Sequence, residues 1–233
     1  MTVAIILSGG IGSRLGGNVP KQYIEVGNKP IFQYSLEQFI SCQGIDMVLL
    51  GINSEWQSWL NEIIEKLHSF IPIKFSQAGA TRQLTIYNAL TLLENQYDVR
   101  DNDKVIIHDA ARPLISHDLI TECISACDNC DGVLPVLPVK NTLYMSNDGQ
   151  YISQLLDRDK IFIGQAPECF KFGPYLKAHH SMPIEQLAKI KGSSELAFMR
   201  GLNIKLLPGD ERNFKITTFA DLNYFKNLMT DES

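Results

Sequence analysis

The sequence predicts an α/β fold in which helices cover both faces of a β-sheet. Apolar runs of strand length alternate along the chain with stretches whose apolar residues recur three and four positions apart, which is typical of such layers. Of the 233 residues, 45% are hydrophobic and 20% are charged, which is enough apolar material to bury a core. Since no repeat or Pro/Gly-rich linker interrupts the alternation, we expect a single domain over residues 1–233.

The elements follow from this alternation in chain order. Short apolar runs predict strands at Val3–Leu7, Met47–Gly51, Ile73–Phe75, Lys104–His108 and Gly132–Pro138. Segments with one apolar face predict helices at Ile31–Cys42, Trp56–His68, Gln83–Glu94, His117–Cys130 and Ala220–Met229. In α/β folds of this kind, ligands bind at the carboxyl ends of the strands.

Residues 139–158 break the alternation and predict a projecting β-hairpin, which we call the arm. Thr142 and Tyr144 precede the turn Ser146-Asn147-Asp148-Gly149, and Tyr151-Ile152 follow it. A two-stranded ribbon is only marginally stable alone. We therefore expect the arm to pack against the second subunit of a homodimer; the alternative is that it folds back over its own domain.

Charge and hydropathy exclude several classes of protein. The chain has 21 Lys and Arg against 26 Asp and Glu, a net charge of −5, which is the wrong balance for a protein that coats nucleic acid. The apolar runs are far shorter than the roughly 18 residues of a membrane span. With no basic leader before Val3 and an odd number of cysteines, five, we expect reduced thiols, a cytoplasmic location, and neither membrane nor nucleic-acid partners.

The loop after the first predicted strand has the composition of a phosphate cradle. It reads Ser8-Gly9-Gly10-Ile11-Gly12-Ser13-Arg14-Leu15-Gly16-Gly17 and leads into Pro20-Lys21-Gln22. Glycines let the backbone approach a ligand and direct N–H groups at an anion. Leu15 breaks the dinucleotide-binding fingerprint, and Asn18-Val19 stand where a P-loop needs Lys and Ser or Thr. A tight strand-to-helix connection is the alternative, but the cations Arg14 and Lys21 favour a polyphosphate.

Two later segments carry further chemistry. Asp109 ends an apolar run, where α/β folds place ligands, and a carboxylate that faces a phosphate loop can hold Mg²⁺. A strand-end Asp is otherwise often a helix cap. Near the C-terminus, Lys215 lies in Asn213-Phe214-Lys215-Ile216-Thr217-Thr218, either as a site cation or as a solvated lysine, with Thr218 or Asp221 capping the last helix.

These elements, in this order, resemble the cytidylyltransferases that act on sugar-alcohol phosphates, whose branches use 2-C-methyl-D-erythritol 4-phosphate or D-ribitol 5-phosphate. The resemblance covers nearly the whole chain and includes Gly79–Thr85, His108–Pro113, Pro138–Thr142, Arg158, Gly164–Glu168 and Asn213–Thr218. It implies a Rossmann-like nucleotidyltransferase sheet and transfer of CMP from CTP to a sugar-alcohol phosphate, with release of pyrophosphate. It also implies Mg²⁺ as cofactor and a homodimer joined through the arm.

The resemblance further implies a role for each matching residue. The catalytic cations would be Arg14, Lys21 and Lys215. Nucleotide contacts would come from Ser8, Gly9, Gly10, Gly12, Gly79, Arg82 and Thr85. Acceptor contacts would come from Asp109, which is also near the metal, and from Arg112, Thr142, Arg158 and Ser193. Of these, Arg112, Thr142 and Arg158 would reach the acceptor phosphate across the dimer, where an arginine fork suits a terminal phosphate.

The sequence departs from the family pattern only on the acceptor side. Asn141 replaces Asp, Ala166 and Glu168 replace Thr and Gln, and Ser193-Ser194 replace Thr-Asp. On the nucleotide side, Thr85 keeps the hydroxyl of the more common Ser. The pattern therefore identifies the nucleotide better than the acceptor and does not separate the two branches.

Three other features of the sequence bear on alternative functions. Cys123, Cys127 and Cys130 have the spacing of an iron–sulfur triad, but within a helical pattern they share one face, which predicts small buried side chains. His179-His180 has no partner at ligand spacing and predicts a surface pair. Leu15 opposes a dinucleotide oxidoreductase. The alternatives left open are a non-catalytic nucleotide-binding relative and a transferase for a different polyol or sugar phosphate.

Overall fold

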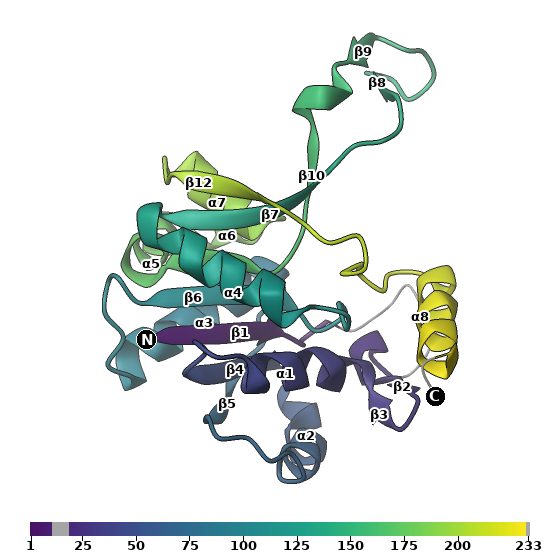
Figure 1. The fold of residues 1–233 in the computed structure, drawn as a ribbon. Coiled ribbons are helices and arrows are strands. Elements are labelled where there is room, and N and C mark those ends of the chain that lie inside the picture. The colour runs from purple at the N-terminus through teal and green to yellow at the C-terminus, as the bar shows by residue number, and fades with distance from the viewer. Residues whose placement is uncertain (11–18, 232–233) are drawn as a thin grey trace.

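A computed structural model describes residues 1–10 and 19–231 of the chain (Figure 1). Its centre is an eight-stranded sheet in the order β10-β7-β11-β6-β1-β4-β5, with β12 also paired to β7. The strands are β1 Thr2–Leu7, β4 Met47–Ile52, β5 Ile73–Gln77, β6 Lys104–Asp109, β7 Gly132–Pro138, β10 Phe162–Gly164, β11 Glu168–Lys171 and β12 Ile204–Pro208. The β5-β4-β1-β6 half is parallel, whereas β11 runs antiparallel to β6 and β7.

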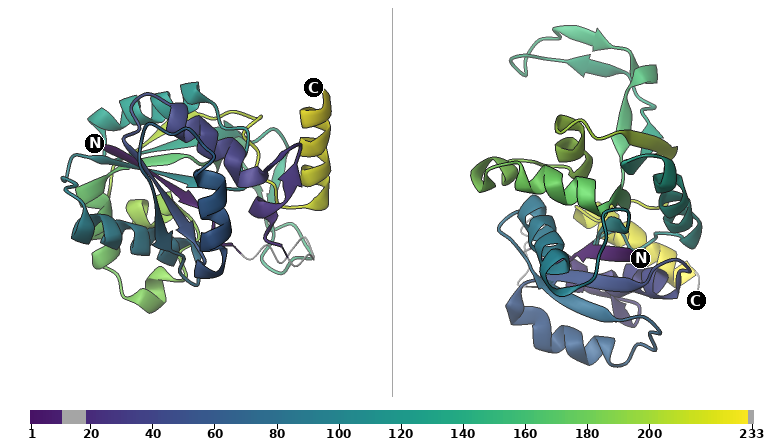
Figure 2. Two further views of the ribbon diagram at one scale, coloured as in Figure 1. Left: turned by 90° about the horizontal axis from the view of Figure 1, so that it is seen from below. Right: turned by 90° about the vertical axis from the view of Figure 1, so that its left-hand side faces the viewer.

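Helices cover both faces of this sheet, as the α/β prediction required (Figure 2). They are α1 Ile31–Ser41, α2 Gln57–Ile64, α3 Arg82–Gln96, α4 His117–Ala126, α5 Phe172–His180, α6 Ile184–Leu187, α7 Ser193–Met199 and α8 Phe219–Asp231. Residues of α1, α2 and α4 pack in one buried cluster, and residues of α3, α5 and α7 pack in another. The predicted fold class is confirmed.

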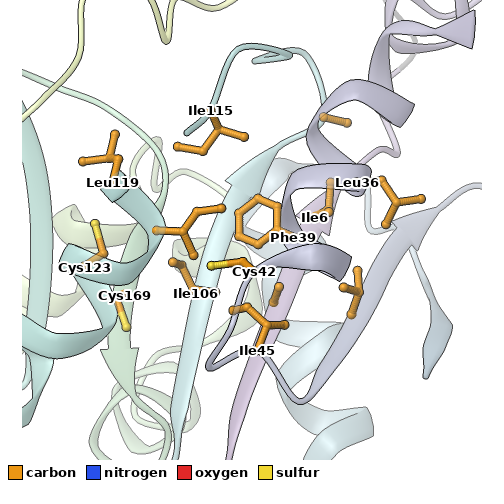
Figure 3. Packing of buried hydrophobic residues seen from close by; sticks show 14 of the residues in the cluster. Ile6, Leu36, Phe39, Cys42, Ile45, Ile106, Ile115, Leu119, Cys123 and Cys169 are labelled. Atoms are coloured by element: carbon orange, nitrogen blue, oxygen red, sulfur yellow. The ribbon is translucent and has the colours of Figure 1, made fainter. Parts of the chain in front are cut away.

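The central strands are apolar throughout because both of their faces are buried. Along β1, Ala4 and Ile6 belong to the cluster under α1 and α4, while Val3 and Ile5 belong to the cluster under α3 and α5. Phe39 of α1 lies among these side chains on the first face (Figure 3). Parallel pairing in the order β6-β1-β4-β5 then brings the carboxyl ends of these four strands side by side.

Several predicted boundaries need correction. The helix predicted at Trp56–His68 is a 3₁₀ turn, Ser54–Trp56, followed by α2, which ends at Ile64. The helix predicted at His117–Cys130 ends at Ala126 and continues as a 3₁₀ turn, Cys127–Asn129. Both segments keep their apolar contacts after the α-helical ladder stops, so the apolar period alone overestimates helix length.

The arm projects from the end of β7, away from the rest of the fold (Figure 1). Its strands are β8 Leu143–Met145 and β9 Gln154–Leu156, paired in antiparallel fashion. The hairpin is therefore confirmed, but Tyr151-Ile152 lie in the loop and not in the second strand. That loop is ordered by Asp148, whose Oδ1 accepts hydrogen bonds from the backbone N–H groups of Gln150 and Tyr151.

The C-terminal helix α8 stands to one side of the sheet (Figure 1) and forms a separate small core. Its Leu222 and Phe225 pack on Val26 and Ile31, next to the short hairpin of β2 (Glu25–Val26) and β3 (Lys29–Pro30). Thr218 caps it, as one sequence interpretation required, since its Oγ1 accepts a hydrogen bond from the N–H of Asp221. Within residues 1–10 and 19–231, no helix is long and apolar enough to span a membrane.

Candidate active site

A cavity of about 630 Å³ opens where the central parallel strands end. Its floor follows β1, β4, β5 and β6 in turn, since Gly9, Asn53, Gly79 and Asp109 come at or just after their carboxyl ends. The described residues that line it are Leu7, Gly9, Gly10, Lys21, Gln22, Asn53, Gly79, Ala80, Thr81, Arg82, Thr85, Asp109, Ala111, Lys215 and Thr217. Eight of the residues predicted for the site are among them.

The start of the glycine-rich loop is held from behind by side chains. Gln22 donates from Nε2 to the carbonyls of Ser8 and Gly10, both at 2.7 Å, and Asn53 donates to the carbonyl of Gly9 at 3.1 Å. Ser8 is buried, and its Oγ donates to the hydroxyl of Tyr23. Because these contacts satisfy the carbonyls, they fix the backbone at the mouth of the cavity. Ser8 therefore lies beneath the cavity and is not among its lining residues.

Two positions of this region require glycine, because any side chain there would collide with a neighbouring residue. A Cβ on Gly9 would lie 2.2 Å from the Cβ of Ala78, and a Cβ on Gly79 would lie 2.5 Å from that of Leu84. Gly9 therefore lets the loop after β1 pack closely on Ala78, which follows β5, and Gly79 lets the loop after β5 pack closely on the first turn of α3. Gly12 and Arg14, predicted for the loop after β1, lie outside the described residues.

The N-terminus of α3 points its first turn at the cavity. Thr81 caps the helix by accepting a hydrogen bond from the N–H of Leu84 at 3.3 Å. Thr85 Oγ1 accepts from the N–H of Gly79 and donates to the carbonyl of Thr81, each at 3.0 Å. The predicted hydroxyl of Thr85 thus shapes the loop of residues 79–81. The positive end of the helix dipole faces the space where an anion would lie.

Asp109 is buried and surrounded by cations from three parts of the chain. Its Oδ1 lies 3.2 Å from Arg82 Nε, and its Oδ2 lies 2.9 Å from Lys215 Nζ and 3.4 Å from Arg112 Nε. Burial alone would raise the pKa of this carboxyl, but Arg82, Lys215 and Arg112 hold the pKa well below its usual range. The strand-end Asp is therefore an ionised hub of the site and not a helix cap.

A segment that we call the strap, residues 210–218, brings Lys215 to this hub. Asn213 is fully buried, donates to the carbonyl of Ala166 at 2.6 Å, and accepts from Arg112 Nη1 at 2.7 Å. Further along, the N–H of Ile216 donates to the carbonyl of Ala111 at 2.8 Å, and Lys21 Nζ donates to the carbonyl of Ile216 at 2.7 Å. The strap thus joins the two lysines predicted to be catalytic.

The remaining predicted acceptor residues do not line the described cavity. Ser193 is fully buried and accepts a hydrogen bond from Arg82 Nη1 at 2.6 Å, so it is linked to the site from behind. Arg112 touches Asp109 but is also mostly buried. Thr142 and Arg158 lie on the arm, where Arg158 donates to the carbonyl of Lys140 within its own chain. A single chain therefore does not bring Thr142 and Arg158 to the cavity.

Sequence reasoning assigned no role to Asn53 and placed His179 wrongly. Asn53 directly follows β4, two residues after the end of the predicted strand Met47–Gly51, and this position near a strand end was the signal that could have found it. His179 was expected at the surface, but it is fully buried, with Nδ1 2.8 Å from the carbonyl of Tyr175 and Nε2 2.6 Å from Gln83 Nε2. Its neighbour His180 is exposed, as predicted, and lies 3.5 Å from Glu94.

The predicted cysteine packing is borne out. Cys123, Cys127 and Cys130 are buried and free and belong to one core cluster with Cys169, although Cys127 and Cys130 lie beyond the end of α4. Figure 3 shows Cys123 beside Cys169. In the described part of the chain, no group of three or more His, Cys, Asp or Glu side chains could hold a metal ion.

Among the described residues of the cavity, Asp109 is the group most suited to contact a divalent cation. Asp109 offers a single carboxylate, and both of its oxygens already accept from cationic side chains. Mg²⁺ commonly binds through one or two carboxylates and otherwise through waters and substrate phosphates. The residues present therefore fit a cation that arrives with a polyphosphate better than one held by the protein alone.

Comparison with known proteins agrees with this geometry. Residues 2–231 match the family model described as IspD, 2-C-methyl-D-erythritol 4-phosphate cytidylyltransferase. A ribitol-5-phosphate cytidylyltransferase of Streptococcus pneumoniae serotype 2 is 28% identical over 98% of this chain and 99% of its own length.

Two solved structures extend the likeness to the fold. The 2-C-methyl-D-erythritol 4-phosphate cytidylyltransferase of Francisella tularensis is 26% identical with a TM-score of 0.79, covering 96% of this chain and 97% of its own. The 4-diphosphocytidyl-2C-methyl-D-erythritol synthase of Anaerococcus prevotii shares the fold with a TM-score of 0.82 at 24% identity, covering 98% and 96%. Since the family model spans nearly all of the sequence, the chain belongs to the IspD family of cytidylyltransferases.

Proposed function

We propose that this protein transfers CMP from CTP to a sugar-alcohol phosphate and releases pyrophosphate. The observation that carries the proposal is the cavity at the strand ends of an acidic protein, where Arg82 and Lys215 contact Asp109 and Lys21 lines the same space. Family membership supports the nucleotide and the reaction type. The named relatives act on two acceptors, 2-C-methyl-D-erythritol 4-phosphate and ribitol 5-phosphate, and both belong in the test.

In this proposal the triphosphate lies between the loop after β1 and the first turn of α3. An oxygen of the acceptor phosphate attacks the α-phosphorus of CTP, the bond from that phosphorus to the β-phosphate oxygen breaks, and pyrophosphate leaves. Negative charge builds around the phosphorus, and Lys21 and Lys215 lie where they can stabilise it. A phosphate oxygen is already ionised near neutral pH, so the attack needs no general base.

Asp109 keeps the cations in place before the substrates arrive. Its ionised carboxylate holds Arg82, Arg112 and Lys215 close together, which would otherwise repel one another. When bound, Mg²⁺ would neutralise part of the phosphate charge, and Asp109 is the residue that would meet it. Gly79 and Thr85 shape the loop of residues 79–81 at the far end of the cavity, where we place the cytosine.

We place the acceptor phosphate at a site that a second copy of the chain completes. We also propose that the protein works in the cytoplasm. The arm carries Thr142 and Arg158 away from its own cavity and exposes Tyr144, Tyr151, Ile152 and Leu155. Burying those side chains against a two-fold mate would stabilise both arms and deliver Arg158 to the partner's cavity.

The test is a coupled assay of pyrophosphate release. CTP and Mg²⁺ are incubated with the protein and one of a panel of polyol phosphates, including both named acceptors and glycerol 3-phosphate. We expect acceptor-dependent release of pyrophosphate and formation of a CDP-linked sugar alcohol. Binding of CTP without release for any acceptor would instead favour a non-catalytic nucleotide-binding relative.

A further inference from the structure

A second carboxylate, Glu168, lies buried behind the cavity. It begins β11, where it pairs with Ile107 of β6, and it is only 6% exposed. Its Oε1 lies 3.2 Å from Arg82 Nη2, and its Oε2 accepts from the N–H and the Oγ of Ser194, at 2.8 and 2.6 Å. Among the described residues that line the cavity, Glu168 is absent, so it acts on the site only through its neighbours.

Arg82 is the neighbour that matters, because each nitrogen of its guanidinium has a partner in the protein. Nε donates to Asp109, Nη1 to Ser193 and Nη2 to Glu168, at 3.2, 2.6 and 3.2 Å. Burial by itself would lower the pKa of Arg82, but the carboxylates of Asp109 and Glu168 raise it, so the side chain stays charged. Arg82 thus lines the cavity as a cation whose charge is shared between two carboxylates.

The balance of charge explains what the second carboxylate adds. The single carboxylate of Asp109 is in contact with three cations, Arg82, Arg112 and Lys215. Without Glu168, the positive charge of Arg82 would be balanced only by Asp109, which Arg112 and Lys215 also contact. The triphosphate of a bound nucleotide would then be the nearest negative charge available to Arg82. With Glu168, the guanidinium is held back against β11 and the start of α7.

We propose that Glu168 is a positioning residue that keeps Arg82 as a cross-link between Asp109 and α7 and prevents it from binding the phosphates of CTP. The inference rests on the proposed function, since it assumes that CTP occupies this cavity. It makes Arg82 a positioning group for Asp109, and it gives Ser193 the same task through its contact with Arg82. Accurate placement of Asp109, rather than tighter nucleotide binding, is what Glu168 supplies to catalysis.

The proposal predicts that the isosteric substitution Glu168→Gln strengthens the binding of CTP while it slows catalysis. The variant keeps the shape and a hydrogen-bonding group but loses the charge, so Arg82 turns toward the triphosphate. We expect the dissociation constant of CTP, measured by titration calorimetry without acceptor, to fall about fivefold, and the gain to shrink at high salt. We expect kcat to fall about tenfold, because Asp109 loses its tether.

Two control variants separate this role from a merely structural one. Glu195 accepts hydrogen bonds from the N–H groups of Lys191 and Gly192 at the same end of α7, and no contact with Arg82 is recorded among the described residues. Glu195→Gln should lower the melting temperature without changing the affinity for CTP. Ser194→Ala removes one hydrogen bond to Glu168 but leaves its charge, so it too should leave the affinity for CTP within twofold of the parent's.

The outcomes are distinct for the two proposals. An unchanged or weaker affinity for CTP in Glu168→Gln overturns the positioning role, as does the same tightening in Glu195→Gln. A parent protein that binds CTP but transfers nothing to any polyol phosphate removes the proposed function and leaves the affinity comparison standing. A parent protein that binds no CTP overturns both.

Discussion

The floor of the cavity and the arm are built on opposite principles. Around Asp109, charged side chains from β6, α3 and the strap are buried or partly buried and are paired within one chain. On the arm, large apolar side chains are exposed, with Tyr151 at 77%, and Arg158 contacts only groups near it in sequence, the carbonyl of Lys140 and the carboxylate of Asp159, among the described residues. This difference supports our proposal that one chain completes the nucleotide half of the site and that the acceptor half needs a second subunit.

The largest effect should come from the cavity lysines. Lys21→Ala and Lys215→Ala should each lower kcat about a hundredfold or more, since a group aimed at developing charge contributes roughly 3–4 kcal/mol. The steady-state rate of pyrophosphate release measures this, and circular dichroism checks the fold. Lys226→Ala, at an exposed position on α8, is the matched control and should behave like the parent. Near-normal turnover in either cavity variant would contradict the proposed mechanism.

The second effect joins the two regions in one experiment. Lys21→Ala disables the cavity and Arg158→Ala disables the arm, so each homodimer is inactive. After subunit exchange at equal amounts, half of the dimers are mixed and one of their two sites has both residues, so activity should recover to about a quarter of the parent's. Proven exchange without recovery, or a fully active monomer, would show that the arm serves its own chain.

A smaller effect tests the nucleotide end of the cavity. Thr85→Val leaves the N–H of Gly79 and the carbonyl of Thr81 without their side-chain partner, so the loop that shapes the base site loosens. We expect kcat/KM for CTP to fall about tenfold and the preference for CTP over ATP to narrow. Thr85→Ser keeps the hydroxyl and should stay within about twofold of the parent. An equal loss in Thr85→Ser, which keeps the hydroxyl, would contradict the role assigned to the hydroxyl.

The smallest expected effect on activity comes from the core, where two buried histidines, which do not line the described cavity or lie on the arm, change the stability of the fold with pH. Burial lowers the pKa of His108 and of His179 to about 4, so the unfolded chain binds these protons at a higher pH than the folded chain does. The contribution of these two neutral histidines to the free energy of unfolding is complete above about pH 6.5 and is lost as the pH falls toward about 4. By pH 5 the loss is about 2 kcal/mol for each histidine.

Denaturant unfolding at pH 7 and pH 5 measures this loss. His179→Gln should remove about half of the pH-dependence that the two buried histidines contribute. His180→Gln, at the exposed neighbouring position, should leave it unchanged. An identical pH-dependence in the His179 variant and the parent would refute the assignment.

Sequence reasoning succeeded where the physical cause is local. β1, β4 and β6 are buried on both faces, so each contains an apolar run that can be recognised without its neighbours. β11 was missed because its four residues begin with Glu168 and end with Lys171, and only their antiparallel fit between β6 and β7 makes them a strand.

The same limit applies to the site. Gly9 and Asp109 can be recognised from the sequence by their places at the ends of apolar runs, and Lys21 by its place after the glycine-rich loop. The contact of Lys21 with the carbonyl of Ile216 and the three-way contact of Arg82 join residues far apart in the sequence. No local pattern encodes such pairings, because they depend on how the whole sheet assembles.

The strap has a consequence for the order in which the protein becomes competent during synthesis. A nascent chain that has emerged as far as residue 200 already contains β1, β4, β5 and β6, which can form the parallel half of the sheet. It still lacks Lys215 and the carbonyl of Ile216 that engages Lys21. The ribosome-bound intermediate would thus carry a folded cavity without its full set of cations, and catalytic competence would be acquired late in translation, after most of the fold.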